Sequence, residues 1–247
     1  MKKLLVVALS MFFTAGIFAG DAAYFVDEGF SSDGSVYVFG QYGKTDRTFN
    51  SYAEIFTVDV AKNDFVSDGI FRTLPGKAPA NESGLKTYEK LEQRSAFYLK
   101  KYNLKKTNAE NLLYVCDDES KKGTETIEFT DFELSTLEKP VKWLIKLIPS
   151  FYGSGQNLAS SFYISIKEID PAGQLLNEYK VGSPDVKRKN ITGYKIEKII
   201  RDESRKNIVF IVEKTLEDRD GISFRYMVET FSVRWFFSFS IIFRKAE

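Results

Sequence analysis

Residues 29–39 read Gly-Phe-Ser-Ser-Asp-Gly-Ser-Val-Tyr-Val-Phe, and residues 52–60 read Tyr-Ala-Glu-Ile-Phe-Thr-Val-Asp-Val. The Ser-Asp-Gly sequence is typical of a tight turn, because Asp hydrogen-bonds nearby backbone groups and Gly tolerates a positive φ. The stretches that follow it are rich in β-branched and aromatic residues, which strands favour. We therefore expect antiparallel strands at about 36–39 and 52–60, joined by a polar loop from Gln41 to Ser51, with a third strand at 65–66.

The same patterns continue along the chain. A hairpin is expected at 162–181, because its turn Asp-Pro-Ala-Gly has Pro where φ is near −65° and Gly where φ is positive. Further strands are expected at 112–116, 124–134, 194–200, 208–214 and 224–233. The predicted fold class is mainly β, with antiparallel meanders in a β-propeller-like or sandwich arrangement.

One amphipathic helix is expected in the middle of the chain. Residues 73–84 contain two Pro and two Gly and are predicted to be a loop. From 85 to 102 the apolar side chains recur at roughly helical spacing: Leu85, Tyr88, Leu91, Phe97, Tyr98, Leu99 and Tyr102. The segment 140–149 has helical spacing too, but its length and its enclosing prolines also allow a strand.

The first 20 residues have the composition of a secretory signal peptide. Lys2 and Lys3 precede an apolar run from Leu4 to Phe18, and small residues follow it. The run is shorter than the ~20 residues of a spanning helix. Cleavage is expected after Ala19 or after Ala22, which leaves a single mostly-β secreted domain at about 21–247 in the periplasm or outside the cell. The mature chain is expected to have no transmembrane segment.

Composition excludes several classes of function. The chain has no His, so Ser-His and Cys-His catalysis and His-ligated zinc are excluded. Its single cysteine, Cys116, cannot form an intramolecular disulfide and is expected to be a buried, inert thiol. With 35 basic and 34 acidic residues, the balance gives no electrostatic reason to expect a nucleic-acid partner. We predict no cofactor, no metal and no catalytic residue.

Two resemblances follow from particular residues. The string from Phe30 through Phe39 to Asp59 is similar to a blade of the TolB-type periplasmic propellers, and 208–233 repeats its order weakly. The chain also resembles an uncharacterised family of predicted secreted bacterial proteins. That resemblance rests on the segments 20–25, 29–34, 39–43, 52–55, 193–196 and 225–228. It implies export and brings no activity with it.

The binding site predicted from sequence lies after the first strand. Gln41, Tyr42, Asp46 and Arg47 belong to the expected loop, and such side chains suit recognition of a glycan or peptide. A hairpin loop with a Gly-Tyr-Gly bulge is the plainer interpretation of the same residues.

Acidic clusters offer weaker candidates. Four acids near the mature N-terminus could form a carboxylate pair for acid–base work on a sugar, or could be a solvated segment and a turn: Asp21, Asp27, Glu28 and Asp33. The acidic stretches 117–119 and 217–221 lack calcium-loop spacing and are expected to be charged turns. The apolar tail 233–243 is expected to be a closing strand, or an edge that meets a partner or a membrane.

From these observations the expected function is that of an exported, non-enzymatic periplasmic binding or scaffolding module, whose partner is an envelope protein or a glycan. Two alternatives stay open: a carboxylate-dependent enzyme acting on cell-wall glycan, and a structural envelope protein that assembles through its tail.

Overall fold

A computed structural model describes residues 21–117, 123, 125–136, 139–218 and 221–232. The expected signal peptide, the tail after Ser232 and part of the acidic loop at 117–123 lie outside these residues. The elements are β1 (Asp21–Ala22), β2 (Tyr24–Phe30), β3 (Val36–Lys44), β4 (Ser51–Asp59), β5 (Asp64–Thr73), α1 (Gly84–Leu99), β6 (Leu112–Val115), β7 (Ile127–Thr136), β8 (Lys139–Tyr152), β9 (Ala159–Ile169), β10 (Leu175–Val181), β11 (Arg188–Lys189), β12 (Ile191–Arg201), β13 (Asn207–Asp218) and β14 (Gly221–Ser232), with short 3-10 turns at Lys100–Tyr102, Ala109–Asn111 and Gly155–Asn157. The expected mainly-β class is confirmed.

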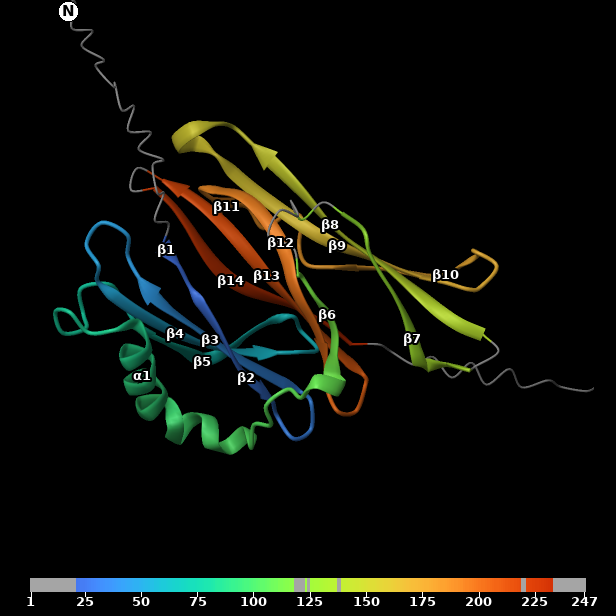
Figure 1. Cartoon of the computed structure of the whole chain (residues 1–247), viewed down its shortest axis with the longest axis horizontal. Helices are drawn as coiled ribbons and strands as arrows, with labels where there is room; N and C mark the ends of the chain where they lie inside the picture. Colours follow the sequence, from blue (N-terminus) through green and yellow to red (C-terminus); the bar gives the residue numbers. More distant parts are fainter. Residues whose placement is uncertain (1–20, 118–122, 124, 137–138, 219–220, 233–247) are drawn as a thin grey trace, which may run out of the picture.

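The elements stack in layers (Figure 1). Sheet A, in the order β1-β14-β13-β12-β6, lies in the middle. Sheet B, in the order β2-β3-β4-β5, covers one face of sheet A, and α1 covers the far face of sheet B. Sheet C, in the order β10-β9-β8-β7 with β11 beside β9, covers the other face of sheet A. The described residues thus form a layered sandwich, and the blade resemblance to TolB-type propellers is not confirmed.

The strand β13 shows why sheet A is central. Its residues 208–212 are continuously apolar, as expected for a strand that is buried on both faces. Ile208, Phe210 and Val212 pack into the core shared with sheet C. Val209 and Ile211 point the other way, into the core shared with sheet B. The strand β3 repeats this pattern, with Tyr37 facing sheet A and Val38 facing α1.

The predicted helix is confirmed as α1 with the 3-10 turn that follows it. Ser83 caps its first turn, accepting a hydrogen bond from the Lys86 N–H at 3.2 Å. Tyr88 and Leu91 are buried against sheet B. Two members of the predicted apolar stripe are exposed, Leu85 at 50% and Phe97 at 93% of their surface.

The ambiguous segment 140–149 belongs to the strand β8. Trp143, Ile145 and Leu147 point into the core, and β9 pairs with β8 beside them. Every second residue is therefore buried, which is the period of a strand. Pro149 is tolerated because the pairing of β7 with β8 ends at Ile145, which leaves the other edge of β8 without a ladder there among the described residues.

The prediction of a polar loop from Gln41 to Ser51 is wrong in its bounds. The strand β3 continues to Lys44, which pairs with Ser51, so the connecting turn spans only 45–50. The two glycines that suggested a loop are sheet positions of close approach. A Cβ at Gly40 would lie 2.1 Å from the Tyr88 Oη, and one at Gly43 would lie 2.5 Å from the Tyr52 Oη.

Candidate functional site

The residues predicted to bind a ligand do not converge on one surface. Gln41 is buried and faces sheet A, where its Nε2 donates to Glu54 at 2.7 Å and its Oε1 accepts from the Tyr226 N–H at 2.8 Å. Tyr42 is the next residue along the strand and faces α1, with its ring 5.4 Å from that of Tyr88. Asp46 and Arg47 lie in the turn after β3, on the surface. A binding role for these four residues stays a prediction.

Gln41 instead closes the free edge of β14. The strand β1 covers that edge only beside Ser223 and Phe224. Further along, Gln41 accepts from the backbone of Tyr226, and Asn63 accepts from the Thr230 N–H at 2.6 Å. One amide side chain from β3 and one from the turn between β4 and β5 therefore take the place of a neighbouring strand, which protects the edge from pairing with another chain.

The N-terminal acids are held apart by separate partners. Asp27 accepts from the Tyr37 hydroxyl at 3.0 Å on the sheet A side of sheet B, and Glu28 accepts from the Tyr88 hydroxyl at 2.6 Å on the helix side. Asp33 is held in its own turn, where hydrogen bonds from the Ser31 and Ser35 hydroxyls lower its pKa to about 2. These carboxylates do not face a common cleft.

Asp21 is the fourth of these acids, and it is part of a buried cluster. Its carboxylate pairs with the Arg225 guanidinium and accepts from the Tyr52 hydroxyl at 3.0 Å. The guanidinium lies over the ring of Tyr52, 4.3 Å from its centroid. Asp21 therefore ties the start of the described chain to the end of sheet A rather than facing a substrate.

A groove of about 780 Å³ lies along β14, and we call it the β14 groove. Its walls come from the turn between β4 and β5, the end of β10 with the segment up to 186, the strand β11, and the strands β13 and β14. Apolar side chains line much of it: Val60, Val181, Val186, Met227 and Phe231. Its size suits a small molecule.

Charged side chains gather inside the β14 groove. Glu229 is buried, accepts a hydrogen bond from Asn63 and lies 3.6 Å from the Arg188 guanidinium. Burial raises the pKa of Glu229, although Asn63 and Arg188 oppose this shift. Arg188 also stacks over the Phe162 ring, 5.1 Å from its centroid, so its position is fixed by packing as well as by charge.

Lys214 is the least compensated of these charges. It extends from β13 on the face shared with Phe210 and Val212, and no carboxylate of the described residues forms an ion pair with it. Burial lowers its pKa to about 8; Glu54 opposes this shift, while Arg188 and Arg225 add to it. A cleft with a perturbed, unpaired cation is a physically motivated candidate for anion binding.

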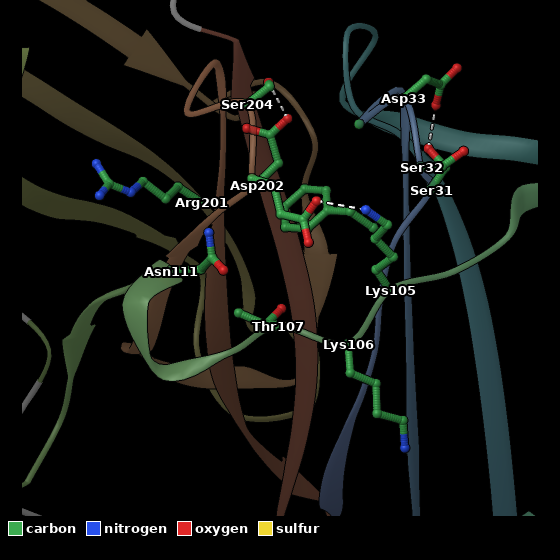
Figure 2. A pocket seen from close by; sticks show the side chains of 13 residues that line it. Ser31, Ser32, Asp33, Lys105, Lys106, Thr107, Asn111, Arg201, Asp202 and Ser204 are labelled. Carbon is green, nitrogen blue, oxygen red and sulfur yellow. Dashed lines mark hydrogen bonds and ion pairs between the residues drawn. The ribbon is translucent and has the colours of Figure 1, made fainter.

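A second hollow, of about 70 Å³, lies where the turns at 31–34 and 201–204 approach the segment 105–111 (Figure 2). Most of its polar groups form hydrogen bonds or ion pairs with neighbouring protein residues. Asp202 accepts from the Ser204 hydroxyl at 2.6 Å and from two backbone N–H groups of its own turn, and Lys105 pairs with Glu203 at 2.7 Å. This hollow is a junction between turns, and it holds only a few water-sized molecules.

The sequence carries one local signal for the β14 groove. Residues 208, 210 and 212 are apolar and inward-facing, and the next residue in that phase is Lys214. A lysine in the buried phase of a strand marks either a strand end or a site. Arg188 gave no such signal, because its contacts with Glu229 and Phe162 come from distant parts of the chain.

The described residues present neither a metal-binding cluster nor a membrane-spanning helix. They contain no cluster of three or more Cys, Asp or Glu side chains placed to hold a metal ion. Within the same ranges, no helix is both long enough and apolar enough to span a bilayer. Cys116, expected to be buried, is partly exposed.

Comparison with known proteins supports one family. The family model described as "Predicted secreted protein (DUF2259)" matches residues 38–232, well over half of the chain. No curated protein and no solved structure gives a match. The resemblance to an uncharacterised secreted family is thereby confirmed: the chain belongs to this family of predicted secreted proteins.

Proposed function

We propose that the protein is exported to the periplasm or beyond, that its mature part is a single domain, and that it is a non-enzymatic binding module whose β14 groove takes a small amphipathic anion. The observation that carries the proposal is Lys214, a partly buried cation in a groove with apolar walls. The charges of Arg188, Arg225 and Arg72 act on it, and no carboxylate of the described residues forms an ion pair with it.

The chemistry of the groove favours such a ligand. A carboxylate or phosphate beside Lys214 would offset the repulsion from Arg188 and Arg225. The apolar part of the ligand would lie against Met227, Phe231 and the valines of the groove. Glu229 disfavours an anion in its immediate vicinity, so the ligand's charge is expected at the Lys214 end.

The test is a titration of the mature protein with decanoate, with decanol as the uncharged match, followed by calorimetry. Decanoate is expected to bind at least tenfold more tightly than decanol, a difference of about 1.4 kcal/mol. The variant Lys214→Met should lose this preference. Lys77→Met, an exposed lysine in the loop before α1, serves as the matched control and should retain it.

Two outcomes would overturn the proposal. Equal binding of decanoate and decanol would show that the groove does not select an anion. Equal decanoate binding by Lys214→Met and by Lys77→Met would place any selective site elsewhere.

A further inference from the structure

The outer face of sheet C, which points away from sheet A, is built differently from an ordinary solvated sheet surface. Along β8, the inward residues Trp143, Ile145 and Leu147 are almost completely buried. The outward residues that alternate with them are Leu144, Lys146 and Ile148, and a depression of about 640 Å³ lies over them. Its apolar members are partly buried on a face that no other layer covers among the described residues.

The strand register arranges the polar groups in rows. Lys146 pairs with Ser165, and Ser165 pairs with Lys180, so these three residues form one row across β8, β9 and β10. With strands about 4.8 Å apart, the two lysines are anchored roughly 10 Å apart with a hydroxyl between them. In the next row Tyr163 lies beneath the Lys180 ammonium, which is 4.3 Å from its ring centroid.

Among the described residues, positive charge on this face is in excess. In the depression, Lys167 pairs with Glu178 at 3.5 Å. Lys146 and Lys180 have no ion pair with a carboxylate of the described residues, and both are exposed. Further along β8, the Lys187 ammonium lies 4.5 Å from the ring centroid of Tyr152 and adds another cation.

The shape distinguishes between anionic partners. A membrane surface is met best by protruding apolar side chains, but here Leu144 and Ile148 are partly buried while Lys146 and Lys180 are exposed. A chain-like anion can lie in the depression and meet the lysines along its length, and Ser165 and Tyr163 offer hydroxyl groups for hydrogen bonds with sugars.

We propose that the outer face of sheet C binds a linear acidic polysaccharide, whose carboxylates contact Lys146 and Lys180. This surface is separate from the β14 groove except at Lys180, which lines both. The proposal therefore does not depend on the groove having a ligand.

The test uses the mature protein in affinity electrophoresis through gels that contain polygalacturonate or, as the neutral match, dextran. Retardation is expected in polygalacturonate only, and it should weaken as salt rises toward 0.5 M, where screening shortens to about 4 Å. Lys146→Glu should raise the apparent Kd at least tenfold. Lys86→Glu, an exposed lysine on α1, is the charge-matched control and should change it less than twofold.

The same variants separate this surface from the groove. Lys146→Glu should leave decanoate binding unchanged, and Lys214→Met should leave polygalacturonate binding unchanged. The proposal is overturned if dextran retards the protein equally, if Lys146→Glu and Lys86→Glu behave alike, or if the protein binds phosphatidylglycerol vesicles but not polygalacturonate.

Discussion

The amide side chain of Gln41 can donate and accept hydrogen bonds, and in the fold it does both. Replacement by Leu keeps the approximate size but leaves Glu54 and the Tyr226 N–H each without one partner. Because unsatisfied buried polar groups are costly, Gln41→Leu is expected to lower the free energy of unfolding by about 2–4 kcal/mol. Urea denaturation followed by tyrosine and tryptophan fluorescence measures this difference.

The matched control for that substitution is Gln93→Leu on the exposed side of α1. It makes the same chemical change where solvent satisfies the amide, so its effect should stay within about 0.5 kcal/mol. If both variants lost the same stability, the loss would belong to the Gln-to-Leu change itself and not to the edge of β14.

Lys214 gives the protein a pH dependence at alkaline pH. Its pKa falls from an ordinary 10.5 to about 8 in the folded protein, mainly through burial. Between these values the unfolded chain holds a proton that the folded protein has released, so stability rises with pH in this window. The destabilisation is fully present below pH 8 and relieved above 10.5.

We expect the stability difference between the natural chain and Lys214→Met to shift by up to about 3 kcal/mol in favour of the natural chain between pH 7 and pH 10.5. Chemical denaturation at each pH measures this difference in unfolding free energy. The contribution of tyrosine titration is common to both proteins and therefore cancels in the difference. A flat difference across this range would mean that Lys214 is solvated like a surface lysine.

The functional residues were harder to predict than the strands, for a physical reason that Gln41 and Arg188 illustrate. Gln41 lies beside glycines that suggest a loop, and only the rings of Tyr88 and Tyr52 reveal why glycine is needed there. Arg188 meets Glu229 and Phe162 across three strands of two sheets. Local composition does not contain these contacts.

Among the elements, α1 is held by a few side chains rather than by its whole apolar stripe. Leu91 is 2% exposed and Leu85 is 50% exposed, on the same helix. Leu91→Ala is expected to cost about 2–5 kcal/mol, because it opens a cavity against sheet B, while Leu85→Ala should cost less than about 0.5 kcal/mol. Urea denaturation compares the two. Similar losses would show that α1 does not pack on sheet B as described.

The strands and α1 were predictable because their periods are local. In the segment 140–149 the local period does not decide between helix and strand. A helical period fits Val141, Leu144, Ile145 and Ile148. A strand period fits Trp143, Ile145 and Leu147. The neighbouring strand β9 decides the outcome, since it pairs with β8 along 142–152. A pattern that satisfies two periods is resolved only by the partner that buries one of its faces.

At the scale of the whole molecule, the order of the layers depends on which apolar sheet faces pack against each other. The apolar run in β13 predicted a strand, and the structure adds that sheets B and C each bury one of its faces. The repeat between 36–58 and 208–233 is a real similarity of two antiparallel pairs, β3 with β4 and β13 with β14. These pairs stack on each other within one core.

The contacts of Asp21 favour one of the two expected cleavage positions over the other. Asp21 is 7% exposed, and it joins Arg225 and Tyr52 while β1 pairs with β14. Cleavage after Ala19 would keep these contacts. Cleavage after Ala22 would remove β1 and leave a partly buried guanidinium without its carboxylate, at a cost of about 3–5 kcal/mol.

We therefore expect the secreted protein to begin at Gly20, and the intact mass of the protein recovered from outside the cytoplasm measures this directly. A chain that starts at Ala23 would contradict the expectation. Purified proteins that begin at Gly20 and at Ala23 then test the reason: if the shorter one unfolds at the same urea concentration, Asp21 does not hold the N-terminus to sheet A. If it unfolds earlier, Asp21 and Ala22 are part of the fold, because Asp21 neutralises Arg225 and both residues pair with β14.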